Sequence, residues 1–224
     1  MARPPRPWLV QDTSVATTGL IASCVAAFVW LEIRGGSSDV GVLIMNGAKF
    51  TPLIRAGEWW RLVTCIFLHS GPLHLAVNSY SLYNLGGLAE RLFGSARFLT
   101  IYLLSGLWGS IASTLLSDPW AVSIGASGAV FGVAGSLFHF AAAYPRHFMA
   151  LAGRRFVVVV AANLIIGFAA GGIDGIAHLG GLVGGFVVSV ALGFPYETPE
   201  SYRTAARVGV AAATVAGTYL AIVG

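Results

Sequence analysis

The sequence predicts an all-α fold, a polytopic membrane bundle of six core transmembrane helices followed by a seventh at the C-terminus. Hydrophobic residues make up 56% of the chain and charged residues only 10%, whereas about a quarter of the residues in a soluble domain are charged. The mean hydropathy is +0.78. Long uncharged stretches also recur along the chain, and a helix needs about 20 apolar residues to span a bilayer.

Seven stretches are apolar enough to be considered as spans. In chain order they are residues 14–31, 62–89, 98–117, 119–145, 156–173, 175–192 and 208–224. Two of them are overlong. Gly71 and Pro72 interrupt the second, so its helix is expected to start near Leu73. The fourth is expected to become helical near Ser127. We therefore divide the chain into an N-terminal arm (1–13), a six-helix core (14–193), and a linker with the seventh helix (194–224).

Basic residues predict the orientation, because cytoplasmic loops of membrane proteins are enriched in Arg and Lys. With the N-terminus inside, nine lie on the cytoplasmic side: Arg3, Arg6, Arg91, Arg97, Arg146, Arg154, Arg155, Arg203 and Arg207. Four lie outside, all after the first span: Arg34, Lys49, Arg55 and Arg61. The N-terminus is thus expected in the cytoplasm and the C-terminus outside. A single lysine among abundant Arg, Ala and Gly is typical of GC-rich bacterial genomes, so we expect a bacterial cell membrane.

Four polar residues are expected at one depth near the outer surface. His74 and Asn78 lie in the first turns of the second span, Ser127 opens the fourth, and His178 lies in the first turns of the sixth. Polar groups within a membrane are costly and mark functional sites. Gly181 and Gly185 follow His178 on the same helix face, so a neighbouring backbone can approach the imidazole. A hydrogen bond between Ser127 and His178 is therefore expected.

Structural roles remain alternatives for each of these residues. A serine between glycines is often a packing position, and a buried histidine often bonds a carbonyl. A metal site built from His69, His74 and His178 would need further ligands, and Asp174 is the nearest carboxylate. His69 is interpreted as bonding the loop and His139 as packing near the cytoplasmic side. The two cysteines, Cys24 and Cys65, suggest no disulfide framework.

Several motifs in order resemble the rhomboid family of intramembrane serine proteases. They are "WWR" at residues 59–61, "HLAVN" at 74–78, Glu90, "GASG" at 125–128 and "AHLGGLVGG" at 177–185. They extend from the loop before the second span into the sixth, so the resemblance covers most of the chain. The seventh span resembles the six-plus-one subgroup.

The resemblance implies a role for each matching residue. Ser127 matches the nucleophile and His178 the general base. His74, Asn78 and the Ser127 amide match the groups that stabilise the oxyanion. Gly125 matches a glycine in the loop on the substrate-binding side, and Arg61 matches an arginine that looks structural. Some members carry Tyr at the position of Phe131. Phe131 keeps the aromatic ring that packs on the histidine but lacks the hydroxyl.

The expected mechanism is a Ser–His dyad, because no third acidic partner is evident and Asp174 is expected to face the outer loop. Water would reach the dyad from a cavity that opens to the outer face, where irregular backbone is tolerated. The expected substrates are transmembrane segments of other membrane proteins, presented within the lipid bilayer. No cofactor, metal or nucleic-acid partner is expected. The alternatives are a catalytically silent rhomboid-like protein that binds membrane helices, and a transporter or channel.

Overall fold

The protein is described here from a computed structural model that covers residues 14–151, 153–169, 172–195 and 200–224. Regular secondary structure within these ranges is helical, apart from one isolated antiparallel bridge between Lys49 and Ser123. The expected N-terminal arm (1–13) and part of the expected linker lie outside these ranges.

The helices confirm most of the expected boundaries. They are α1 (Val15–Ile33), α2 (Val40–Met45), α3 (Thr51–Arg55), α4 (Arg61–Thr64), the 3₁₀ turn η1 (Cys65–Phe67), α5 (Gly71–Ser81), the π-helical turn η2 (Leu82–Gly86), α6 (Gly87–Phe93), α7 (Ser95–Leu116), α8 (Ser127–Ala143), α9 (Pro145–Leu151), α10 (Gly153–Ala169), α11 (Gly175–Leu192) and α12 (Glu200–Val223). The break at Gly71 and Pro72 and the helix start at Ser127 are as expected.

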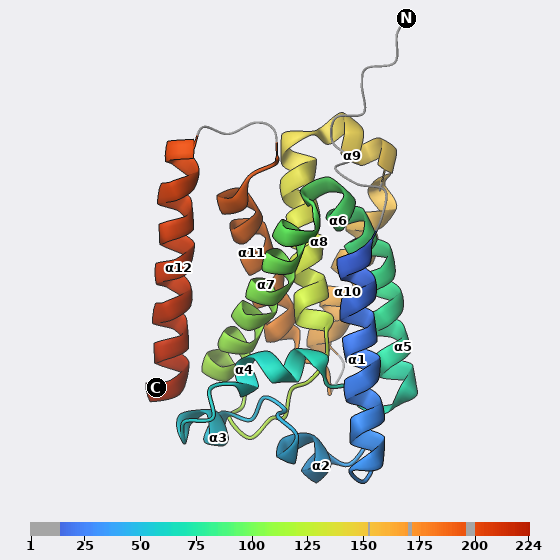
Figure 1. The fold of residues 1–224 in the computed structure, drawn as a ribbon, viewed down its shortest axis with the longest axis vertical. Coiled ribbons are helices and arrows are strands. Elements are labelled where there is room, and N and C mark those ends of the chain that lie inside the picture. Colours follow the sequence, from blue (N-terminus) through green and yellow to red (C-terminus); the bar gives the residue numbers. More distant parts are fainter. Residues whose placement is uncertain (1–13, 152, 170–171, 196–199) are drawn as a thin grey trace, which may run out of the picture.

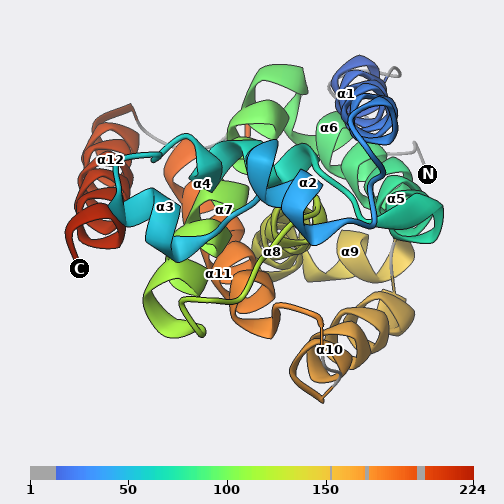
Figure 2. The same ribbon diagram turned by 90° about the horizontal axis from the view of Figure 1, so that it is seen from below.

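The long helices form a bundle around a central group of three, α7, α8 and α11 (Figures 1 and 2). Helix α11 packs most extensively against α8 and α7. Helices α1, α5 and α6 cover one side of this group and α12 covers the opposite side, while α10 lies at the periphery (Figure 2). The short helices α2 to α4 lie across the lower end of the bundle in Figure 1.

Four helices in the described ranges are long and apolar enough to cross a membrane: α1, α7, α11 and residues 203–223 of α12. A fifth span results if α9 and the following part of α10, bent by 78°, are counted together. Helix α8 is apolar but shorter, and the second expected span is divided among α5, η2 and α6. The fold is a polytopic helical bundle. That it crosses the membrane seven times stays a prediction.

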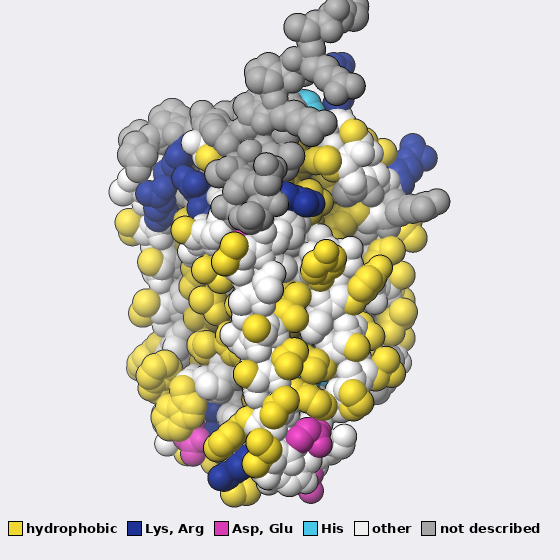
Figure 3. Space-filling model, turned by 45° about the vertical axis from the view of Figure 1, so that its right-hand side comes forward, with side chains coloured by type: hydrophobic (Ala, Val, Ile, Leu, Met, Phe, Trp, Pro, Cys, Tyr) yellow, Lys and Arg dark blue, Asp and Glu magenta, His cyan; other side chains and the backbone are white. Residues whose placement is uncertain are grey.

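The surface agrees with a membrane location. Charged side chains gather at the two ends of the molecule, and hydrophobic side chains cover the band between them (Figure 3). Large apolar side chains of the long helices are exposed, including Val77 of α5, Val159 of α10 and Val215 of α12. Exposure of so many apolar groups fits contact with lipid rather than water.

Small residues bring α8 and α11 into backbone contact. A side chain added at Gly181 would collide with the Gly128 backbone, and one added at Gly185 would collide with Gly132. Both glycines of α11 lie on the face that carries His178. The two helices are therefore as close as their backbones allow at the level of the site.

A buried carboxylate fastens the start of α1 to the end of the second expected span. Glu90 is fully buried and accepts hydrogen bonds from the Ala16 amide at 2.9 Å and the Thr17 amide at 2.8 Å. The hydroxyls of Thr17 and Ser95 each donate to it at 2.7 Å. These four bonds explain how a carboxylate is held inside an apolar bundle.

The loop between α1 and α5 (residues 34–70), called the outer loop after its predicted side, is organised around Arg61. This side chain is 5% exposed, and its guanidinium donates to the carbonyls of Ile44 at 2.6 Å and Ala48 at 3.0 Å. It also forms an ion pair with Glu58 at 2.6 Å. These contacts hold the segment that contains α2 against α4.

Candidate active site

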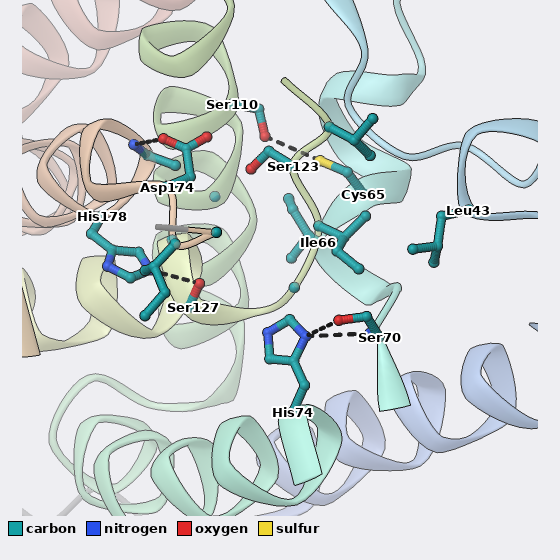
Figure 4. A pocket seen from close by; sticks show the side chains of 18 of the residues that line it. Leu43, Cys65, Ile66, Ser70, His74, Ser110, Ser123, Ser127, Asp174 and His178 are labelled. Atoms are coloured by element: carbon teal, nitrogen blue, oxygen red, sulfur yellow. Dashed lines mark hydrogen bonds between the residues drawn. The ribbon is translucent and has the colours of Figure 1, made fainter. Parts of the chain in front are cut away.

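The structure brings Ser127 and His178 together near the end of the bundle across which α2 to α4 lie. Ser127 is the first residue of α8, and His178 lies in the first turn of α11. The His178 Nε2 atom is 2.9 Å from the Ser127 Oγ atom (Figure 4). His178 is 6% exposed, so this hydrogen bond is shielded from bulk water. The two residues are 51 positions apart in sequence and meet only because α8 and α11 pack so closely.

The ring of Phe131 stacks on the His178 imidazole and restrains its orientation. Its centroid is 4.4 Å from that of His178, with 19° between the ring planes, so the two rings are stacked. Phe131 lies one turn after Ser127 on α8 and is itself buried. The same helix thus supplies both the hydroxyl and the aromatic face.

The loop before Ser127 is hydrogen-bonded to the outer loop at several points. Lys49 and Ser123 exchange backbone hydrogen bonds of 3.0 and 3.1 Å, and the Gly125 amide donates to the Cys65 carbonyl at 2.9 Å. Gly125 has a φ of +112°, a conformation that favours glycine. These contacts fix the direction from which the chain enters α8.

Gly125 also lies directly against His74. A side chain at Gly125 would come within 2.8 Å of the His74 Nε2 atom. The Ser70 amide donates to the other ring nitrogen, Nδ1, at 3.3 Å. In the neutral ring the proton is then on Nε2, which can donate into the site. His74 and Ser127 both line one cavity (Figure 4).

Asn78 lies one turn after His74 and is 7% exposed. Its Nδ2 atom donates to the His74 carbonyl at 3.0 Å and lies 3.9 Å from where a Gly125 side chain would begin. The second hydrogen of this amide group has no acceptor among the residues that the structure describes, so it can be donated to a ligand. The structure therefore gathers Ser127, His178, His74, Asn78 and Gly125 in one place.

Two cavities meet at the Ser127–His178 pair. One, of about 460 Å³, lies between the outer loop and the ends of α7, α8 and α11, and Cys65, Ser110 and Asp174 contribute to its wall. The other, of about 240 Å³, lies between α5, α8 and α10. Its lining includes Val77 and Val159, two apolar residues with exposed side chains. The pair is thus reached both from the outer loop and from the lipid-facing side.

His69 supports the loop rather than joining the pair. Its Nε2 atom accepts a hydrogen bond from the Ala126 amide at 3.4 Å, and its Nδ1 atom is 3.1 Å from the Phe67 carbonyl. Burial, together with the nearby His74, lowers the pKa of His69 to about 4. The ring is therefore neutral at pH 7, with its proton on Nδ1. This agrees with the loop-bonding role expected from the sequence.

The remaining candidates are separate from this site. His139 is stacked on Phe194, with 4.5 Å between the ring centroids, and it packs near Phe186. Within the described ranges, His, Cys, Asp and Glu side chains form no group of three or more suited to hold a metal ion.

The expectation for Asp174 needs correction. Its carboxylate is engaged between helices and is not simply directed at the outer loop. It accepts from the Ala177 amide at 2.9 Å and from the Ser113 hydroxyl of α7. An Asp immediately before an apolar helix is an N-cap pattern, and this signal could have indicated the contact.

Other supporting residues gave no sequence signal. Ser70, which orients His74, and Ser123, which pairs with Lys49, lie in loops whose course depends on distant segments. Ser113 is one of several small polar residues on α7. Cys65 forms a contact of 3.3 Å with Ser110 that spacing alone does not indicate.

Comparison with known proteins gives consistent matches. Residues 56–194 match the family model for the Rhomboid domain. The chain is 45% identical to rhomboid protease GluP of Bacillus subtilis (strain 168) over 175 residues, 78% of this chain and 34% of GluP. It is 37% identical to YdcA of the same bacterium over 61% of this chain and 68% of YdcA. It is also 36% identical to RHOMBOID-like protein 4 of Arabidopsis thaliana over 70% of this chain and 40% of that protein. The chain thus spans about a third of the length of GluP.

Proposed function

The chain belongs to the rhomboid family, a family of serine proteases, and from this premise we propose that it is an intramembrane serine endopeptidase with a Ser127–His178 dyad. The observation that carries the proposal is the 2.9 Å contact between the Ser127 Oγ atom and the His178 Nε2 atom. A hydroxyl is a weak nucleophile until an adjacent base accepts its proton. The contact provides that base in a buried site.

Acylation begins when the Ser127 Oγ atom attacks the carbonyl carbon of the scissile peptide bond, while its proton moves to the His178 Nε2 atom. The carbonyl oxygen becomes an oxyanion. His178 then gives the proton to the leaving nitrogen, the C–N bond breaks, and an acyl-enzyme remains on Ser127. In deacylation, a water molecule gives a proton to His178 as its oxygen attacks the ester. The proton returns to the Ser127 Oγ atom as the acid product leaves.

The oxyanion is stabilised by three donors around Gly125. They are the backbone amide of Ser127 at the start of α8, the His74 Nε2–H group and the free hydrogen of the Asn78 amide. The first amides of a helix have no intrahelical acceptor, and the helix dipole favours negative charge at this end. Donors directed at the position where charge develops contribute strongly to catalysis.

The proposed substrate is a transmembrane segment of another membrane protein. The cavity between α5, α8 and α10 leads from the exposed apolar band to the dyad, which suits a segment arriving from the lipid. To present an extended peptide bond, the segment must leave its helix locally. Small or polar residues that weaken the helix are therefore expected near the cut.

The proposed orientation follows from the charge pattern, and the proposed domain limits follow from the apolar stretches. We place the N-terminus in the cytoplasm and the dyad at the outer face of a bacterial cell membrane. We take residues 14–193 as the catalytic core and residues 194–224 as the linker and seventh helix. The catalytically silent alternative predicts no cleavage despite the presence of both dyad residues.

Cleavage of a single-span reporter in liposomes tests the proposal. Wild-type protein should cut the reporter. Ser127→Ala, His178→Ala and the double variant should be equally inactive, since residues that act as a unit are not additive. A fluorophosphonate should label Ser127 and leave Ser123 and Ser136 unmodified. Undiminished cleavage by Ser127→Ala would remove the activity from this site, and a wild-type protein without cleavage would favour the silent alternative.

A further inference from the structure

The imidazole of His178 lacks a polar partner on one side. Its Nδ1 atom is buried and has no hydrogen-bond partner among the residues that the structure describes. Stacking on Phe131 restrains the plane of the ring, but a flat contact restrains sliding within that plane only weakly. The position of the Nε2 atom therefore depends on where the backbone of α11 begins.

Asp174 fixes the beginning of α11. It is the N-cap residue, and its Oδ1 atom accepts a hydrogen bond from the Ala177 amide at 2.9 Å. Its own carbonyl accepts the His178 amide hydrogen at 3.1 Å. The residue thus holds both His178 and the residue before it (Figure 4).

The second carboxylate oxygen of Asp174 reaches a different helix. It accepts a hydrogen bond from the hydroxyl of Ser113, a fully buried residue of α7. Near this point α7 also approaches α11 through Gly109, where a side chain would come within 2.6 Å of the Ala177 carbonyl. One carboxylate therefore caps α11 and ties its first turn to α7.

We propose that Asp174 is a positioning residue for His178 that acts through the helix backbone. In Ser–His–Asp triads the carboxylate bonds the Nδ1–H group of the histidine directly. Here the carboxylate lies one turn earlier and sets the position of the backbone that carries the imidazole. A displacement of about 1 Å can cost on the order of 10²-fold in rate, so even a small shift of this turn should be visible in kcat.

This inference rests on the proposed function, and three substitutions separate its parts. Asp174→Asn keeps the cap and a polar contact to Ser113, because the Ser113 hydroxyl can accept a hydrogen bond from the Asn amide instead of donating one. Asp174→Ser keeps a good N-cap but is too short to reach α7. Ser113→Ala leaves the cap and removes the contact to α7. Asp39→Ala is the matched control: Asp39 caps α2 through the Val42 amide at 2.9 Å, far from His178 in sequence.

The measurements are kcat and KM on a single-span reporter in liposomes, the rate of fluorophosphonate labelling of Ser127, and the melting temperature. Asp174→Ser and Ser113→Ala should each lower kcat and the labelling rate by about tenfold while KM stays within about twofold. Asp174→Asn should stay within about threefold of wild type. Asp39→Ala should leave kcat near the wild-type value.

The opposite pattern overturns the inference. If Asp174→Ser and Ser113→Ala melt at a lower temperature but keep the wild-type kcat and labelling rate, Asp174 is only a structural cap. If Asp174→Asn is as slow as Asp174→Ser, the negative charge matters rather than the position of the helix. Failure of the proposed function is distinguishable, because the wild-type protein itself would then neither cleave the reporter nor depend on Ser127.

Discussion

At the scale of single residues, the proposed site contains hydrogen-bond donors whose direction is set by neighbours outside the proposed dyad. The Ser70 amide occupies the Nδ1 atom of His74 and thereby directs the Nε2–H group toward Gly125. The Asn78 amide is directed by its bond to the His74 carbonyl. In the proposed mechanism, such preorganised donors require no rearrangement as the oxyanion forms.

Asn78→Ala should lower kcat by about 10²-fold with KM nearly unchanged, since one donor to the oxyanion is lost. His74→Ala should have a similar effect, and the double variant should be less than additive because both serve one oxygen. Cleavage kinetics and detergent melting curves measure both properties. Asn84→Ala is the control, because the exposed Asn84 makes the same kind of bond, to the Tyr80 carbonyl at 2.7 Å. A large fall in melting temperature with normal kcat would assign Asn78 to packing.

His69 should make the outer loop sensitive to acid. Its pKa is lowered from 6.5 to about 4 by burial, so folding favours the neutral ring. The contribution of His69 to stability is present above pH 6.5 and is lost as the pH falls toward 4, by up to about 3 kcal/mol. Melting temperatures of wild type and His69→Asn should therefore converge between pH 6.5 and 4. Parallel curves across this range would contradict the prediction.

At the scale of helices, some boundaries could be predicted from sequence and others could not. The bounds of α11 coincide with the sixth predicted stretch, and α8 begins at Ser127 as expected, because glycines and prolines mark these ends. Helix α12 begins eight residues before the predicted seventh stretch. This additional segment contains Arg203, which is buried and whose guanidinium donates a hydrogen bond to the Phe194 carbonyl at 3.2 Å. A buried arginine of this kind depends on a distant partner and leaves no periodic pattern.

Contact between α8 and α11 should tolerate no added methyl group. Gly185→Ala places a Cβ atom against the Gly132 backbone, so the free energy of unfolding should fall by about 2 kcal/mol and cleavage should fall with it. Gly209→Ala on α12 is the control, because nothing lies within 4 Å of the added atom. It should leave stability equal or slightly raised. Equal stability of Gly185→Ala and Gly209→Ala would show that the helices can separate without cost.

At the scale of the whole molecule, the gathering of the site residues could be anticipated from their common depth, whereas the network behind them could not. Counting positions from the expected helix starts predicts a similar depth for Ser127, His178, His74 and Asn78. The bridge between Lys49 and Ser123 and the contact between Ser113 and Asp174 depend on how loops and helices meet in three dimensions. Such contacts follow from the complete fold and not from any local pattern.

The predicted orientation can be tested with single cysteines. Ala56→Cys lies in the outer loop and Ala150→Cys in α9, and both positions are exposed. An impermeant maleimide applied to intact cells should modify only the first, and both after lysis. The native Cys24 and Cys65 are 2% and 4% exposed, so wild-type protein is the unlabelled control. Labelling of Ala150→Cys alone in intact cells would put the site at the cytoplasmic face.

The separation of Ser127 and His178 along the chain has a consequence for biosynthesis. They are 51 residues apart, and a ribosome adds about 5–20 residues per second, so His178 follows Ser127 out of the ribosome by roughly 3–10 s. If Ser127 and His178 form the proposed dyad, the serine has no base until α11 has entered the bilayer and packed on α8. On the proposed mechanism, a nascent chain should therefore be inert toward neighbouring proteins at the insertion site, and its activity should begin only when the sixth predicted stretch is in place.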